Sequence, residues 1–244
     1  MGSHRQFKLL ARHLAKRGVP TLRFDYRGMG DSDGEVRTFE RVGADIRCAI
    51  DSFFTSIPAL KEVVIWGLCD AASAALLYAH QDARVRGVVL LNPWVRTQQG
   101  LARVHLRHYY VRRLFQASLW QKVVRGELNV RGAAAALGKI VVDAMGRGPS
   151  SGTVEESPAG GSLLPDRMED GLRRFQGRVL LILSGNDLTA QEFKDLVARS
   201  SRWRGLLEDR RVTRHDLPEA NHTFSRRDWR NQVERWTEAW VKNL

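Results

Sequence analysis

The chain has 244 residues, of which 43% are hydrophobic and 27% are charged, which suits one sizeable globular domain with or without an insertion. No apolar stretch is long enough to cross a bilayer or to form the core of a signal peptide, and two cysteines cannot form a disulfide framework. We therefore expect a protein of a reducing, cytoplasmic setting.

Helical and strand-like patterns alternate over the first third of the chain. Helices are indicated by apolar residues at helical spacing, and strands by short runs of β-branched and apolar residues. The pattern predicts, in chain order, a helix at 5–16, a strand at 20–24, a turn-rich loop, a helix that includes 39–53 and ends before Pro58, a strand at 62–66, a helix at 70–80 and a strand at 86–91.

The pattern changes between Pro93 and Phe175. Residues 96–147 contain ten Lys or Arg against two acidic residues, so this segment carries +8 of the net charge of +12. A loop-like sequence rich in Gly, Ser and Pro follows it. After residue 175 the alternation resumes, with a strand from Arg178, a helix at 191–199, a strand near 211–216 and a helix at 226–241.

Strands separated by helices predict an α/β fold with a mostly parallel sheet covered by helices on both faces. We assign residues 1–92 and 176–244 to this core. Residues 93–175 are interpreted as an inserted, basic helical cap with a flexible Gly/Ser/Pro-rich loop, lying over one end of the sheet.

Three reactive residues follow three of the predicted strands. Cys69 follows the strand at 62–66, Asp187 follows the strand that starts at Arg178, and His222 follows the strand that ends near Asp216. The carboxyl ends of parallel strands meet at one edge of a sheet, where sites form. The order nucleophile, acid, histidine, with a strand-turn-helix around the nucleophile, is that of the α/β-hydrolases.

This arrangement predicts a nucleophilic Cys69, a His222 that moves its proton and an Asp187 that orients the histidine. The backbone N–H of Asp70, the next residue, is the expected oxyanion donor. The sequence GLCDA departs from the usual G-x-S-x-G signature at Cys69 and at Ala71, where the last glycine would stand.

Structural interpretations of the same residues stay open at this point. Cys69 could be a buried packing residue, Asp187 a turn or helix-capping residue, and His222 a capping or surface histidine. Cys48 is interpreted as a packing residue, and the Asp70 side chain as a charge in the first turn of a helix. His105 and His108 are interpreted as solvated residues of the cap. Ser73 would be the nucleophile only if the strand-turn-helix has been placed wrongly.

Four segments together resemble the exosortase A system-associated hydrolase 1 family: GSHRQF, LRFDYRGMGDSDGE, WGLCDAASAALLYA and ANHTFS. These α/β-hydrolases are encoded beside exopolysaccharide and protein-sorting systems of Gram-negative bacteria. The resemblance implies Cys69, Asp187 and His222 as the triad, with Asp25 and Arg27 as structural residues. Because the family has strands and an oxyanion loop before GSHRQF, we expect this chain to lack those strands and one oxyanion donor.

The sequence therefore favours a hydrolase that acts on a small carboxylic ester or thioester without a cofactor or a metal ion. An acyltransferase and a non-catalytic accessory or binding protein of the same fold are the alternatives. The basic cap is interpreted as burying its apolar side over the pocket while its arginines face water. Contact with an anionic membrane surface or with an acyl carrier such as CoA is the alternative. No nucleic-acid-binding motif is present, so no nucleic-acid partner is expected.

Overall fold

The computed structural model describes residues 5–95 and 162–244. The chain divides into two compact units, Met1–Val95 with Leu164–Leu244, and Arg96–Leu163. The described residues fall almost entirely in the first unit. Most of the predicted cap at 93–175, together with His105 and His108, lies outside them.

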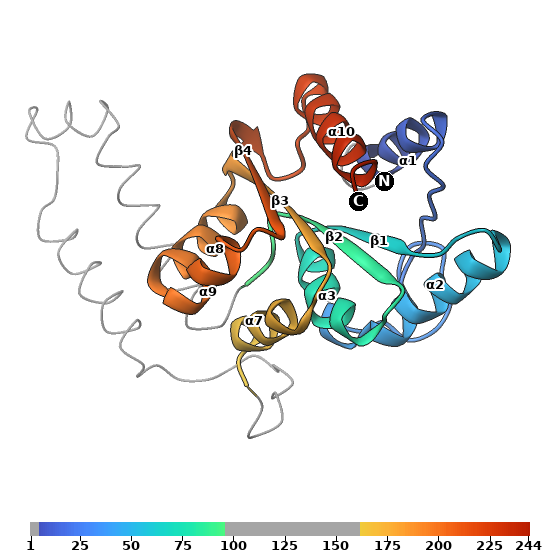
Figure 1. Ribbon diagram of the computed structural model, residues 1–244, viewed down its shortest axis with the longest axis horizontal. Helices are drawn as coiled ribbons and strands as arrows, with labels where there is room; N and C mark the ends of the chain where they lie inside the picture. Colours follow the sequence, from blue (N-terminus) through green and yellow to red (C-terminus); the bar gives the residue numbers. More distant parts are fainter. Residues whose placement is uncertain (1–4, 96–161) are drawn as a thin grey trace, which may run out of the picture. The chain divides into compact units, whose positions relative to one another are not determined.

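Four parallel strands form the centre of the first unit, in the order β1-β2-β3-β4 (Figure 1). They are β1 (Val63–Leu68), β2 (Val85–Leu91), β3 (Arg178–Asn186) and β4 (Val212–Asn221). The two central strands are continuous apolar runs because both of their faces are covered. Their middle residues are at most 2% exposed: Val88, Val89, Leu90 and Leu91 in β2, and Val179, Leu180, Leu181, Ile182 and Leu183 in β3.

Helices cover both faces of this sheet (Figure 1). On one face lie α1 (Gln6–Lys16) and α10 (Arg227–Val241). On the other lie α2 (Gly43–Ser56), α3 (Asp70–Tyr78), α7 (Leu164–Arg174), α8 (Leu188–Arg199) and α9 (Ser201–Leu207), with the short helices η2 (Phe39–Arg41) before α2 and η3 (Ala79–Gln81) after α3.

Each face of the sheet has its own apolar core, and alternate residues of β3 contribute to the two cores. Leu180 and Ile182 pack with Val233 and Trp240 of α10, whereas Leu181 belongs to the core beneath α3, α7 and α8. This alternation follows from the two-residue period of a strand. The predicted α/β fold, a parallel sheet flanked by helices, is confirmed.

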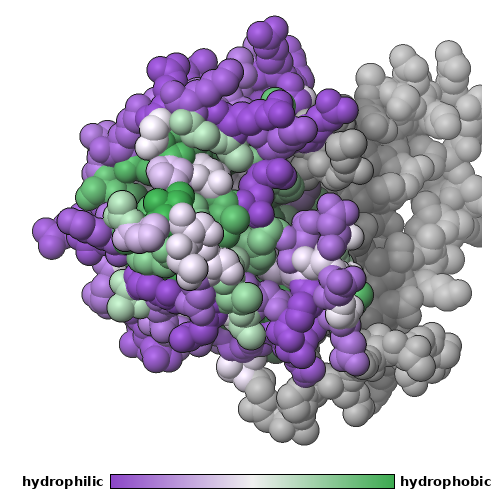
Figure 2. Space-filling view, turned by 90° about the vertical axis from the view of Figure 1, so that its right-hand side faces the viewer, coloured by the Kyte–Doolittle hydropathy of each residue, from purple (hydrophilic) through white to green (hydrophobic). Residues whose placement is uncertain are grey.

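The strand expected at residues 20–24 is wrong. These residues form neither a helix nor a strand, and β1, which ends the sheet, pairs only with β2 among the described residues. Leu22 and Phe24 are 42% and 45% exposed, so the apolar residues at alternate positions gain no buried face. The face drawn in Figure 2 carries an apolar area among hydrophilic residues. High strand propensity without a partner strand does not make a strand.

Helices α7 and α9 were not predicted. Helix α7 lies within the span assigned to the cap, yet it belongs to the first unit, and its Met168 and Leu172 are buried in the core beneath α3. Its sequence, LPDRMEDGLRR, carries six charged residues that mask the short apolar stripe. Whether the remainder of 93–175 forms a cap stays a prediction.

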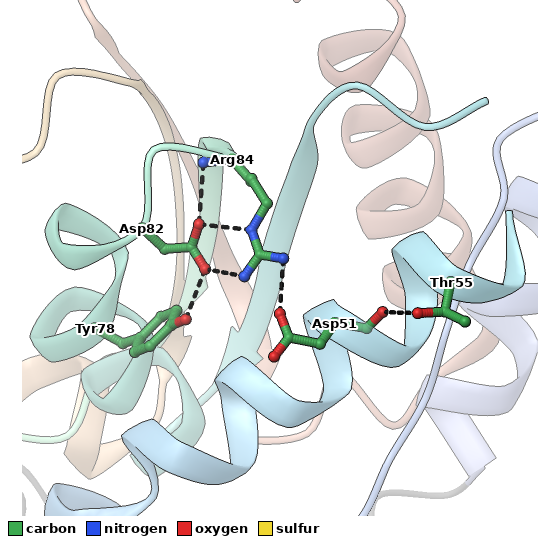
Figure 3. Close-up of polar contacts among 5 residues, drawn as sticks. All are labelled: Asp51, Thr55, Tyr78, Asp82 and Arg84. Carbon is green, nitrogen blue, oxygen red and sulfur yellow. Dashed lines mark hydrogen bonds and ion pairs between the residues drawn. The ribbon is translucent and has the colours of Figure 1, made fainter. Parts of the chain in front are cut away.

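A polar network joins α2 to the segment that leads into β2 (Figure 3). The Asp82 carboxylate accepts hydrogen bonds from the Tyr78 hydroxyl at 2.8 Å and from the Arg84 guanidinium at 2.9 and 2.7 Å. Arg84 also donates to Asp51 at 2.7 Å. The hydrogen bonds from Arg84 hold the pKa of Asp82 well below its ordinary value, whereas burial, followed by the bond to Asp82, raises the pKa of Tyr78 to about 12.

We predict that Asp82→Asn lowers the free energy of unfolding at pH 7 by about 1.5–3 kcal/mol, because it weakens charged hydrogen bonds of a buried carboxylate. A depressed carboxyl pKa stabilises the fold above its ordinary value of 3.8, and this contribution is lost as the pH falls through the folded pKa. Urea unfolding from pH 7 downward measures the difference, which should shrink in acid.

The control is Asp51→Asn, which removes the other partner of Arg84. The Asp51 side chain is 57% exposed, against 6% for Asp82, so its loss should cost no more than about 1 kcal/mol. Equal costs for the two variants would contradict the role given to burial.

Candidate active site

Cys69 occupies a sharp turn between β1 and α3. Its φ of 61° and ψ of −119° lie in a region that residues with a Cβ atom rarely adopt. Such a conformation costs on the order of 1–3 kcal/mol and persists only where the surroundings enforce it. The local sequence explains the position of the turn, since the strand VVIWGL runs directly into a helix rich in alanine.

Main-chain hydrogen bonds hold Cys69 on both sides. Its N–H donates to the Leu91 carbonyl at 2.8 Å, and its carbonyl accepts from the Trp94 N–H at 3.2 Å. The same carbonyl accepts from Ala72 and Ser73, which begin the hydrogen bonding of α3, at 3.1 and 3.2 Å. The end of β2 and the first turn of α3 thus enforce the positive φ of Cys69 together.

The first glycine of the GLCDA sequence is required by close packing. A Cβ atom on Gly67 would lie 2.5 Å from the carbonyl carbon and oxygen of Ala71, closer than atoms can approach. Ala71 itself lies in α3 and has no positive φ, so a Cβ atom is tolerated there. The departure from the G-x-S-x-G signature at this position therefore does not distort the turn.

The β3–β4 ladder brings Asp187 and His222 together. Its last pair is Asn186 with Asn221, so the two next residues leave the sheet side by side. The His222 Nδ1 atom lies 3.0 Å from the Asp187 Oδ2 atom. Asn186 itself ends β3 and is a ladder residue.

Asp187 is both the partner of His222 and the N-cap of α8. Its Oδ2 atom also accepts a hydrogen bond from the Ala190 N–H at 2.9 Å, so the helix-capping interpretation is confirmed and does not exclude the predicted role in the site. Burial, the largest influence, would raise the pKa of this carboxyl group. The hydrogen bonds from His222 and Ala190 outweigh it and keep the pKa below 3.8. Asp187 is therefore an anion at neutral pH.

His222 interacts with both of the other predicted site residues. The hydrogen bond to Asp187, followed by the hydrogen bond to the Cys69 side chain, raises the pKa of His222 to about 10 against the opposing effect of burial. The side chain is 36% exposed, whereas that of Asp187 is 7% exposed. The imidazole therefore links a buried carboxylate to a half-buried sulfur and carries a proton at neutral pH.

Asp70 is the first residue of α3. The first N–H groups of a helix have no partner within the helix, which leaves the Asp70 N–H suited to an anionic oxygen near Cys69. The Asp70 side chain accepts from the Ala71 N–H at 2.9 Å. Its charge also acts on Tyr26, since burial, followed by the charges of Asp70 and Asp45, raises the pKa of Tyr26 to about 12.

Tyr26 belongs to the DYRGMGDS turn, which has polar contacts of its own. Arg27 forms an ion pair with Asp45 of α2, and the Asp25 carboxylate accepts from the Asp31 N–H at 3.3 Å. The Asp25 carbonyl accepts from the Ser32 hydroxyl at 2.8 Å. These contacts agree with a structural role for Asp25 and Arg27.

Two other candidates are apart from this arrangement. Ser73 is fully buried in α3, and its hydroxyl donates to the Trp94 carbonyl at 2.6 Å. Cys48 is exposed on α2, so its interpretation as a packing residue is wrong. The apolar stripe of α2 runs through Ile46 and Ile50, and Cys48 lies off it.

Asn92 is a residue of this region that the sequence analysis missed. It follows β2 directly, is fully buried and has a positive φ of 44°. Its side-chain amide bonds to the main chain at Ser184 and His222. The sequence signal at this position is the Asn92–Pro93 pair, which predicts a turn but does not indicate a functional site.

The sequence profile of the alpha/beta hydrolase family matches residues 2–235. The chain belongs to this family. No curated protein matches the chain significantly.

Solved alpha/beta structures resemble this hydrolase in fold. An esterase from Pyrococcus furiosus, Pf2001, is 13% identical, with a TM-score of 0.61 over 99% of this chain and 76% of its own. The esterase domain of a Rhodothermus marinus protein is 16% identical, with a TM-score of 0.54 over 100% and 81%. A thermophilic esterase from Thermogutta terrifontis is 14% identical, with a TM-score of 0.51 over 98% and 85%. At these identities the likeness concerns the fold alone.

Two further properties of the hydrolase concern the described ranges only. Within 5–95 and 162–244, no group of three or more His, Cys, Asp or Glu residues is placed to hold a metal ion. No helix in these ranges combines the length and the apolar character needed to cross a membrane.

The backbone strain at Cys69 can be measured directly. We predict that Cys69→Gly is more stable to urea than Cys69→Ala by about 1–3 kcal/mol, because glycine adopts a positive φ without a Cβ clash. Equal stability of the two variants would show that the turn is unstrained. The pair Cys48→Gly and Cys48→Ala, in the middle of α2, is the control, and there alanine should be the more stable by about 1 kcal/mol.

Proposed function

We propose that this alpha/beta hydrolase cleaves a carboxylic ester or thioester through an acyl-cysteine intermediate. Cys69 would be the nucleophile, His222 the proton carrier and Asp187 the residue that orients His222. The observation that carries the proposal is the chain of side-chain contacts from the buried Asp187 through His222 to Cys69, with 3.0 Å between the carboxylate and the ring.

In the first half-reaction, the proton resides on His222 and the Cys69 sulfur carries the negative charge. The sulfur attacks the substrate carbonyl carbon, a C–S bond forms, and the carbonyl π electrons move to the oxygen. The Asp70 N–H stabilises that oxyanion. When the intermediate collapses, the bond to the leaving oxygen or sulfur breaks, and the His222 imidazolium gives its proton to the leaving group.

In the second half-reaction, His222 takes a proton from water as the water oxygen attacks the acyl carbon. The C–S bond to Cys69 then breaks, the carboxylic acid leaves, and the charged pair of His222 and Cys69 is restored. Asp187 keeps the ring oriented through both steps and stays ionised. An alcohol or thiol in place of water would make the same site an acyltransferase.

An ester substrate is supported by the structural comparison, since three of the proteins with a similar fold are described as esterases. The resemblance to the exosortase-associated hydrolases extends the proposal to exopolysaccharide or protein-sorting systems. A cytoplasmic location is proposed from the two free cysteines. Contact of the basic residues 96–147 with an anionic membrane or an acyl carrier is proposed from their charge alone.

The test combines turnover with thiol reactivity. We predict that the protein hydrolyses members of a panel of p-nitrophenyl esters and acyl thioesters, and that His222→Ala and Asp187→Asn each lower kcat/KM by about 10²–10⁴. In wild type, iodoacetamide should alkylate Cys69 faster than Cys48 at pH 7, although Cys48 is the more exposed of the two.

Cys48→Ala is the matched control and should leave turnover unchanged. If no panel member is cleaved and Cys69 reacts no faster than Cys48, the enzymatic proposal fails and a non-catalytic accessory or binding role takes its place. Transfer of the acyl group to an added alcohol or thiol in preference to water would assign an acyltransferase.

A further inference from the structure

Asn92 uses each half of its side-chain amide for a different segment of the chain. The Oδ1 atom accepts from the Ser184 N–H at 2.9 Å, and the Nδ2 atom donates to the His222 carbonyl at 3.0 Å. The residue is fully buried, so neither bond is exchanged with solvent. One rigid amide therefore joins the end of β3 to the loop after β4.

These two contacts flank the pair of Asp187 and His222. Ser184 precedes Asp187 by three residues, and between them the β3–β4 register shifts at residues 184–186. The β3–β4 ladder is therefore irregular at this end of β3. Here the Asn92 side chain provides an additional connection between the end of β3 and the loop after β4. The Asn92 N–H completes the attachment by donating to the Ile182 carbonyl at 3.2 Å.

The neighbours of Asn92 hold the third site residue. The Leu91 carbonyl accepts from the Cys69 N–H, and the Trp94 N–H donates to the Cys69 carbonyl. The segment 91–94 therefore makes hydrogen bonds to Cys69, to His222 and to the strand end that leads to Asp187. It is a single short stretch of chain on which the spacing of all three depends.

We propose that Asn92 is a positioning residue of the hydrolase site, which holds the His222 main chain so that the imidazole reaches both Asp187 and Cys69. The inference deepens the proposed function and rests on it. An amide side chain offers an acceptor and a donor on separate atoms, whereas an ionised carboxylate cannot donate and a hydroxyl has one oxygen for both bonds. Asparagine also tolerates the positive φ that the position requires.

The test follows the His222 ring by NMR in protein with ¹⁵N-labelled histidine. Asn92→Gly removes the amide and keeps the left-handed backbone accessible. In wild type the His222 ring should stay protonated at pH 8. In the variant its pKa should fall by about one unit or more toward 6.5, and the rate of Cys69 alkylation at pH 7 should fall about tenfold.

Two references separate positioning from a general loss of stability. Tyr78→Phe removes a buried hydrogen bond to Asp82 in which neither Asn92 nor His222 takes part, and it should lower the melting temperature without changing the His222 titration. His215, whose pKa is lowered by burial and whose ring stacks on Trp236, should titrate identically in all variants. His222→Ala assigns the signal.

An unchanged His222 titration and an unchanged Cys69 alkylation rate in Asn92→Gly would overturn the proposal, whatever the melting temperature. Failure of the proposed function is a different result, namely wild-type Cys69 that reacts no faster than Cys48. If Asn92→Gly does not fold, Asn92→Asp keeps the acceptor for Ser184 and loses the donor to His222. Hydrogen exchange of residues 221–225 should then speed up about tenfold, and unchanged exchange would overturn the proposal.

Discussion

The site depends on the hydrogen bonds that hold Cys69 in a backbone conformation unfavourable for a residue with a Cβ atom. Its N–H and carbonyl are bound to Leu91 and Trp94, and α3 begins from the same carbonyl. These bonds are possible because β1 and β2 are parallel neighbours and because Gly67 allows α3 to approach the end of β1. The parallel sheet is thus the direct cause of the turn.

Electrostatics in the site follow from the same geometry. The end of the β3–β4 ladder places Asp187 and His222 next to each other, and the buried carboxylate makes the proton on His222 more favourable than in water. The lowered pKa of Asp187 contributes stability above pH 3.8, and the raised pKa of His222 contributes stability that is complete below 6.5 and lost as the pH rises through about 10. The pair is therefore favourable for the fold, whereas the turn at Cys69 is costly.

Much of this arrangement could be predicted from the sequence, because it depends on strand ends. The apolar runs before Cys69 and before Asp187 are long and clear, and His222 lies before a strongly periodic helix. These patterns locate the residues that the structure brings together at one edge of the sheet. The structure adds that Ala71 can replace a glycine, since its place in a helix requires no positive φ.

The features that the sequence analysis predicted wrongly or missed have physical reasons of their own. Residues 20–24 have strand propensity, but a strand needs a pairing partner, which propensity does not report. Cys48 is exposed because it lies two residues, about half a helical turn, from both Ile46 and Ile50 and therefore on the opposite face of α2. Asn92 acts through main-chain partners that lie about ninety and one hundred and thirty residues further along the chain, and no local pattern encodes such contacts.

The central claim is that Cys69 carries the acyl group. The most direct measurement mixes the protein with an acyl thioester that it cleaves, quenches the reaction in acid within the first turnover, and maps the modified peptide by mass spectrometry. The account predicts the mass of the acyl group on the peptide that contains Cys69, and none on the peptide that contains Cys48. Turnover without any acyl group on Cys69 would contradict it.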